Sequence, residues 1–267
     1  MQAMMSPTVT PIIRGENRSS DPNQFIAWCD KHISQPEECI MLKATFMLAL
    51  DPTTRLYERI LQIDDINRSI CLNAPILVRM DEVEYWFQAF DNTEKCFDAI
   101  EKNIALNKHI TLITSGSKGK ILIPALKANF PNTFIDGYWM YVFCANMNMC
   151  SVGDIHPTNE WALNYEKNIL MFNHEDDLLT RMVLESALRF SNKADDLQKG
   201  QHLSNQEQEL NENERLRSAQ KYLDWAKKMH ERYKKISTEP GIQAFANIGQ
   251  RISDLERNLG QFHEASN

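Results

Sequence analysis

The stretch from Ile110 to Ile123 constrains the fold of this chain more than any other. It reads Ile-Thr-Leu-Ile-Thr-Ser-Gly-Ser-Lys-Gly-Lys-Ile-Leu-Ile. Its first residues are β-branched or aliphatic, as a strand buried on both faces requires. Gly116 and Gly119 permit backbone angles that other residues rarely adopt, and Pro124 suits the early part of a helix. The stretch predicts the central strand-to-helix corner of an α/β domain.

Size and charge limit the classes of protein to consider. The chain has 267 residues, enough for one well-buried domain and an appendage. A net charge of -7 argues against nucleic acid, because a phosphate backbone attracts dense Lys and Arg. No apolar run approaches the ~20 residues that cross a bilayer, and residues 1–20 lack a secretory apolar segment. The six cysteines are widely spaced in apolar contexts, typical of reduced core thiols. We therefore expect a cytoplasmic protein without a membrane segment.

Apolar runs alternate with helical patterns along the chain, which predicts a doubly wound parallel sheet of about five strands. Residues 1–20 are expected to be disordered. From Pro22 the spacing of Phe25, Trp28, Cys29 and His32 predicts a short amphipathic helix, an N-terminal helical extension. Residues 39–50 fit a helix or a strand, and residues 56–63 fit a helix. The expected strands are Ile76 to Val78, Tyr85 to Phe90, Ile110 to Thr114, Tyr138 to Cys144 and Ile169 to Phe172.

The C-terminal part predicts a helical hairpin. A polar stretch from Ser191 to Gln201 indicates a boundary between an α/β domain at 21–195 and the hairpin at 203–263. Ser204 and Glu207 match a capping box, and Pro240-Gly241 separates the two helices. Apolar residues at alternating spacings of three and four form a seam for self-association or partner docking. The seam contains Leu216, Leu223, Tyr233, Phe245, Ile248, Ile252, Leu255 and Leu259.

Four short motifs occur together between Tyr85 and Phe190. They are Phe90-Asp91-Asn92 with Glu94 and Cys96, Ile113-Thr114-Ser115-Gly116-Ser117 with Gly119, Tyr141 to Asn146, and Trp161-Ala162 with Tyr165. Together they resemble a receiver-like α/β domain that certain invertebrate proteins carry ahead of tetratricopeptide repeats or an ADP-ribosyltransferase domain. The resemblance implies a flavodoxin-like fold in a modular, signalling-type protein, and it transfers no chemistry.

A working phosphoreceiver requires three sites that this chain does not match. It needs a carboxylate at the end of the central strand, an acidic pair after the first strand and a Lys after the last. Here the central strand ends in Thr114-Ser115, the best candidate for the first acidic site is the lone Asp51, and Met171 to His174 contains no Lys. The sequence therefore predicts no phosphotransfer site.

The turn from Ser115 to Lys120 allows two interpretations. Small residues, two hydroxyls and two Lys at a strand-to-helix turn are typical of an anion site. The turn is not a Walker loop, because Thr114 and Ile121 replace the required Gly and Ser or Thr. The alternative is a tight turn whose glycines let the helix pack on the sheet. The candidate ligand-binding residues are Ser115, Gly116, Ser117, Gly119, Lys120 and, in the next loop, Asn146.

Other reactive groups do not form a recognisable catalytic or metal site. Cys144, Cys150 and His156 match no zinc spacing, and Ser115 lacks a Gly-x-Ser-x-Gly elbow. No metal, cofactor or catalytic residue is expected. Our first hypothesis is a non-catalytic signalling or scaffold module that acts through protein–protein interaction. The alternative is a nucleotide or phosphate-ligand binder, including a weak hydrolase, that uses the Ser115 to Lys120 turn.

Overall fold

The structure of this protein is a computed structural model. It describes residues 23–30, 48–49, 59–60, 74–80, 83–134, 139–143, 157–203, 205–236 and 243–265. Residues 1–20, expected to be disordered, lie outside this set, as do Asp51, Cys144, Asn146, Cys150 and His156. In the described residues no helix has the length and apolar character needed to span a membrane.

The described strands form one mixed sheet in the order β3-β2-β4-β5-β1-β6-β7-β8. The strands β5, β1, β6, β7 and β8 are parallel, whereas β4, β2 and β3 continue the sheet in antiparallel fashion. Their bounds are β1 Gln24–Cys29, β2 Leu48–Ala49, β3 Arg59–Ile60, β4 Ile76–Met80, β5 Val83–Phe90, β6 His109–Ser115, β7 Met140–Phe143 and β8 Ile169–Phe172. The predicted α/β class and its five later strands are confirmed, and the antiparallel extension was not predicted.

The first strand corrects the predicted N-terminal helix. Gln24–Cys29 is β1, entirely buried, and it lies between β5 and β6. Phe25 and Trp28 fit a helical spacing, but the run between them is also apolar, as in a strand buried on both faces. β1 therefore separates β5 from β6, the central strand of the predicted corner.

Two further segments before β4 form strands. Arg59–Ile60 is β3, so the helix expected over residues 56–63 is wrong at these two positions. Leu48–Ala49 is β2, which decides the open choice between helix and strand in favour of strand there. Both strands extend the antiparallel side of the sheet, where they pair with each other and β2 also pairs with β4.

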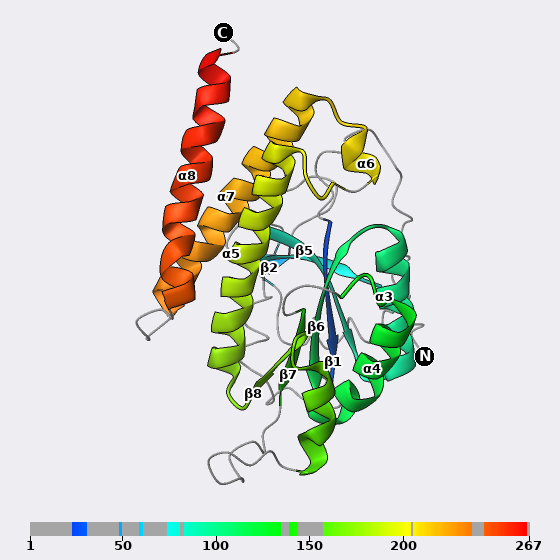
Figure 1. The fold of residues 1–267 in the computed structure, drawn as a ribbon. Coiled ribbons are helices and arrows are strands. Elements are labelled where there is room, and N and C mark those ends of the chain that lie inside the picture. The colour runs from blue at the N-terminus through cyan, green and yellow to red at the C-terminus, as the bar shows by residue number, and fades with distance from the viewer. Residues whose placement is uncertain are drawn as a thin grey trace, which may run out of the picture.

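Helices cover both faces of the sheet (Figure 1). On one face lie α3 (Thr93–Ala105), α4 (Gly116–Asn129) and the 3₁₀ helix η2 (Pro157–Tyr165), and on the other lie α5 (Glu175–Lys199) and α7 (Glu212–Ile236). The residues of β1 alternate between the two cores, because successive side chains of a strand point to opposite faces. Ile26 and Trp28 join the α5 side, whereas Phe25, Ala27 and Cys29 join the α3 side.

The C-terminal helices share the core of the sheet. The polar stretch from Ser191 is helical up to Lys199, and α5 ends at Gly200, which has a φ of 68°. After the short α6 (Asn205–Gln208), α7 begins with a capping box between Asn211 and Glu214, whose backbone N–H groups each donate to the other's side chain at 3.0 Å. The inner face of α7 packs in one cluster with the sheet, so the hairpin and the α/β unit share a hydrophobic core.

The predicted seam of the hairpin lies inside the chain. Leu223, Ile248, Ile252, Leu255 and Leu259 are buried in the sheet's own core cluster. Leu216 and Tyr233 are half-buried against it, and Phe245 lies in α8 (Gln243–Ala265) with its side chain outside the described residues. The seam therefore holds α8 against α5 and α7, where α8 is the outermost helix (Figure 1).

Tyr141 gives a test of the packing beneath α5. Its side chain is 0% exposed, its hydroxyl has no hydrogen-bond partner, and burial raises its pKa. Tyr141→Phe keeps the ring beside Phe172 and removes the unpaired hydroxyl, so we expect a gain of about 1 kcal/mol in the free energy of unfolding. The matched control is Tyr222→Phe, which loses the 2.6 Å hydrogen bond from Asn23 Nδ2 and should lose about 1 kcal/mol. Urea denaturation that ranks the two variants in the opposite order would contradict this packing.

Candidate anion-binding site

The strands β1 and β6 are neighbours, and the chain continues from them to opposite sides of the sheet. The next parallel strand after β1 is β5 on one side, whereas the next strand after β6 is β7 on the other. Open α/β sheets bind ligands at such a switch point, outside the carboxyl ends of the strands. Cys29 of β1 is in register with Thr114 of β6, and α4 begins immediately after Ser115. The predicted corner therefore lies at this switch point.

The N-terminus of α4 lacks a side-chain cap. Ser115 occupies the N-cap position in an extended conformation, yet its side chain makes no capping hydrogen bond. Its hydroxyl lies 3.4 Å from the Ser117 hydroxyl instead. The first turn contains no acidic residue; Lys118 stands in it, and Lys120 follows it. First-turn N–H groups and the helix dipole attract anions when no side chain satisfies them.

The neighbouring helix α3 shows the contrast. Its N-cap residue Asn92 accepts hydrogen bonds from the backbone N–H groups of Glu94 at 2.8 Å and Lys95 at 3.1 Å. Glu94 adds a negative charge in the first turn. Both helices begin at the same edge, because each follows a strand of the parallel set. A third helix, α5, also begins at this edge, and its N-cap residue His174 makes no capping hydrogen bond, but acidic residues stand in its first turn. Of the three, α4 is the helix whose first turn has neither a side-chain cap nor an acidic residue.

Gly119 has a packing role. Neither Gly116 nor Gly119 has a positive φ, so the prediction of unusual backbone angles is wrong at both. A Cβ on Gly119 would lie 3.1 Å from Thr114 Cγ2 and 3.3 Å from Trp161 Cη2, so glycine lets α4 approach both β6 and η2. Pro124 also differs from expectation, because it lies inside α4 and not in its first turn. The interpretation of the turn as a tight packing element therefore applies to Gly119. It does not involve the serines and lysines of the turn, which remain candidates for binding an anion.

We expect Gly119→Val to destabilise the protein. The added methyl groups must displace Thr114 and Trp161, and overpacking of this kind costs about 1–3 kcal/mol. Ala128→Val is the matched control on the exposed side of α4, where the lower helix propensity of Val costs roughly 0.5 kcal/mol. Thermal and urea unfolding would measure both changes. Equal losses in the two variants would show that α4 does not pack closely at Gly119.

Asp30 is a residue of this edge that the sequence did not single out. It follows β1 directly, is 4% exposed, and donates its backbone N–H to Phe90 O at 3.0 Å. It takes the place after the first strand for which Asp51 is the predicted candidate. It was missed because β1 was assigned to a helix. The end of β6 remains Thr114-Ser115, and β8 is followed by Asn173 and His174, so neither position matches a phosphoreceiver.

The other predicted groups follow β7 in the sequence. Asn146, with Cys144, Cys150 and His156, lies outside the described residues. Across the described ranges, no three His, Cys, Asp or Glu side chains lie close enough together to hold a metal ion. The described part of the candidate site thus consists of Ser115, Gly116, Ser117, Gly119 and Lys120.

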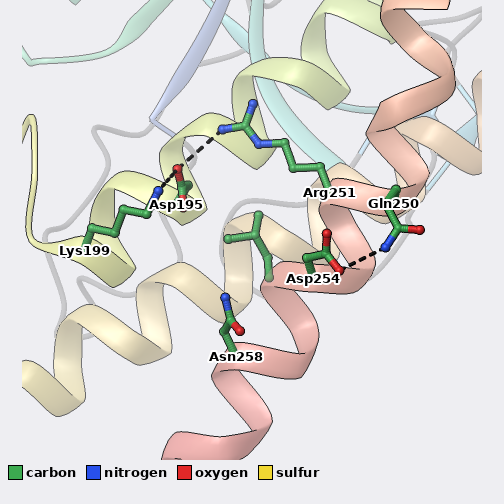
Figure 2. Close-up of a pocket in the computed structure, with 7 residues that line it drawn as sticks. Asp195, Lys199, Gln250, Arg251, Asp254 and Asn258 are labelled. Atoms are coloured by element: carbon green, nitrogen blue, oxygen red, sulfur yellow. Dashed lines mark hydrogen bonds and ion pairs between the residues drawn. The ribbon is translucent and has the colours of Figure 1, made fainter.

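A separate recess of about 470 Å³ lies between α5 and α8. Figure 2 shows Asp195 between two cations, and its Oδ2 lies 2.8 Å from Lys199 Nζ and 3.6 Å from Arg251 Nη2. Gln250 Nε2 donates to Asp254 Oδ1 at 3.0 Å. The recess thus presents both signs of charge, already partly paired within the chain.

At the opposite, amino edge of the sheet, Arg189 joins α5 to β1, to β6 and to Trp139, the residue before β7. Its guanidinium lies 4.0 Å from the ring centre of Trp139, and its Nη1 donates to Gln24 Oε1 and Thr111 Oγ1, both at 3.3 Å. His109 stacks on the same Trp139 ring, and burial, reinforced by Arg189, lowers the pKa of His109 to about 4. This cluster anchors the helix to the sheet, and no motif in the sequence pointed to it.

Comparison of the chain with protein-family models, curated proteins and solved structures gives no match. The receiver-like resemblance of the motifs between Tyr85 and Phe190 therefore stays a prediction. What the protein binds must be inferred from the chemistry of its own side chains.

Proposed function

We propose that this protein binds a small phosphate-bearing ligand at the carboxyl edge of a flavodoxin-like sheet. Numbered along the chain, the parallel strands run in the order 2-1-3-4-5, which supports the flavodoxin-like class. In that class the ligand occupies the switch point, which here lies between β1 and β6. Ser115 and Lys120 belong to the helix that begins there.

The observation that carries the proposal is the uncapped N-terminus of α4. Ser115 is placed to cap the helix and does not, while its hydroxyl and that of Ser117 lie side by side at 3.4 Å. Hydroxyl groups, first-turn N–H groups and the ammonium group of Lys120, which follows the first turn, are donors that match the oxygens of a phosphate group.

Ser115→Asp tests the proposal, because it supplies the missing cap from within the chain. A carboxylate at this position accepts from the first turn and should stabilise α4 by about 1 kcal/mol. It should also occupy the site, so that inorganic phosphate, pyrophosphate and ATP no longer raise the melting temperature as they raise that of the wild type.

The control is Ala128→Asp, which adds the same charge at an exposed position near the other end of α4. It should keep the ligand-induced rise in melting temperature. No shift of the wild type at millimolar concentrations of all three ligands would contradict the proposal. An undiminished shift in Ser115→Asp would place binding elsewhere.

A second proposal is a signalling or scaffold module that acts through protein–protein interaction. The apolar seam is buried, so it is not the surface that would bind a partner. The recess between α5 and α8 favours this second proposal, because both signs of charge line it: Lys199 and Arg251, and Asp195 and Asp254 (Figure 2). A second copy of the chain could pair its own charges with these. Light scattering should then give a dimer mass for the wild type. Arg251→Glu should convert it to a monomer mass, whereas Lys234→Glu, at an exposed position of α7, should leave it unchanged. A monomeric wild type at high concentration would exclude self-association.

A further inference from the structure

Arg189 at the amino edge of the sheet has hydrogen bonds only to neutral oxygens. Its Nη1 donates to Gln24 Oε1 and Thr111 Oγ1, both at 3.3 Å, and its Nη2 donates to the same Thr111 oxygen at 3.4 Å. These bonds are longer than the ~2.7–2.9 Å of an arginine paired with a carboxylate. One turn earlier on α5, the carboxylate of Glu185 pairs with Arg181. Among the described residues, no carboxylate forms an ion pair with Arg189.

A second cation and a neutral imidazole stand close to Arg189. Lys193, one turn later on α5, pairs with Glu207 at 2.6 Å. Burial lowers the pKa of His109, and the charges of Arg189 and Lys193 lower it further, so both cations act on the region around this ring. Glu207 is the acidic group that opposes them there. Two cations and one carboxylate leave this region with one positive charge that has no counter-charge.

We propose that Arg189 binds a small monocarboxylate at the amino edge of the sheet. Trp139 covers one face of the guanidinium, whose carbon lies 4.0 Å from the ring centre, so the N–H groups at the rim of the guanidinium plane are the donors for a ligand. Their fork matches the two oxygens of a planar carboxylate, and a single negative charge balances the site. Arg189 and His109 are half-buried, which leaves a small ion a way to reach them from solvent. This site lies at the edge of the sheet opposite the α4 turn and does not depend on the phosphate ligand proposed there.

Nuclear magnetic resonance of the full chain tests the site with sodium acetate as the probe. Acetate should shift the ring signals of His109 and the indole N–H signal of Trp139 along one saturating binding curve, because both rings lie beside the guanidinium. The variants His109→Gln and Trp139→Phe assign the two signals. Inorganic phosphate at the same ionic strength is the control and should leave both signals in place. The acetate shifts should persist in Ser115→Asp, since that change acts on the α4 turn.

The charges around Arg189 provide a second test with opposite expected results. Glu207→Gln removes the opposing carboxylate and should tighten acetate binding by roughly fivefold, whereas Lys193→Gln removes a cation and should weaken it by roughly fivefold. The matched control is Lys199→Gln, further along α5, where the lysine pairs with Asp195. It should leave the affinity for acetate unchanged.

Three results would overturn the proposal. The first is the absence of any shift at His109 and Trp139 up to the highest acetate concentration at which the protein stays folded. The second is a shift of these signals that disappears in Ser115→Asp, since acetate would then bind at the α4 turn. The third is a change of affinity in the same direction in Glu207→Gln and Lys193→Gln, because the charge at Arg189 would then play no part.

Discussion

Replacing Leu223 by alanine is expected to lower the free energy of unfolding by about 3–4 kcal/mol. Leu223 is 0% exposed on α7, in the cluster that also contains Trp28 and Phe87 of the sheet. Truncation leaves a cavity between the helix and the sheet. Urea denaturation followed by circular dichroism and by tryptophan fluorescence would measure the loss.

Leu163→Ala is the matched control for Leu223→Ala. Leu163 lies on η2 and is 51% exposed, so its truncation should cost less than about 1 kcal/mol. The two optical probes should also give one coincident transition in Leu223→Ala, because helix and sheet unfold together. A loss as small as that of Leu163→Ala would show that α7 does not pack on the sheet.

Arg189→Ala should cost about 3 kcal/mol. The change leaves Gln24 Oε1 and Thr111 Oγ1 without their donor, and both residues are buried. It also removes the cation–π contact with Trp139 and the packing of the long side chain on that ring. Arg189→Lys should recover only part of the loss, since a lysine lacks the planar fork that reaches two acceptors and stacks on the indole.

Arg257→Ala is the control for the arginine. Its guanidinium is exposed and pairs with Asp254 on the same helix at 3.4 Å, so the change should cost below about 0.5 kcal/mol. Differential scanning calorimetry would compare the three variants. Full recovery in Arg189→Lys would show that charge alone matters at this position, against the geometry described for Arg189.

The later strands of the fold could be predicted because each is a short apolar run bounded by turn residues. β1 could not, since a run buried on both faces gives no alternation, and Phe25 and Trp28 happen to match a helical spacing. The prediction of a helix in place of β1 also affects the site. It puts the end of the first strand near Asp51, so Asp30 is not among the predicted site residues. Only the neighbours β5 and β6 show that Gln24–Cys29 is a strand.

The sequence predicts where the candidate site lies, but not whether the helix that begins there is capped by a side chain. The glycines and the strand before them place a helix start after Ser115, and the structure confirms that start. Residue types alone could not show that Asn92 caps α3 while Ser115 leaves α4 open, because both are good capping residues. In the same way, spacing predicted the apolar stripe of α8 but not its partners, which are α5 and α7 of the same chain.

The most direct test of this account is the folding of residues 1–203, the chain cut before α6, α7 and α8. If the sheet and the hairpin share one core, removal of α7 exposes the face that Tyr85 shares with Met229, and the fragment should show no cooperative thermal transition. The full chain under the same conditions should unfold in one step. A fragment that unfolds cooperatively near the melting temperature of the full chain would show instead that the hairpin is an independent appendage.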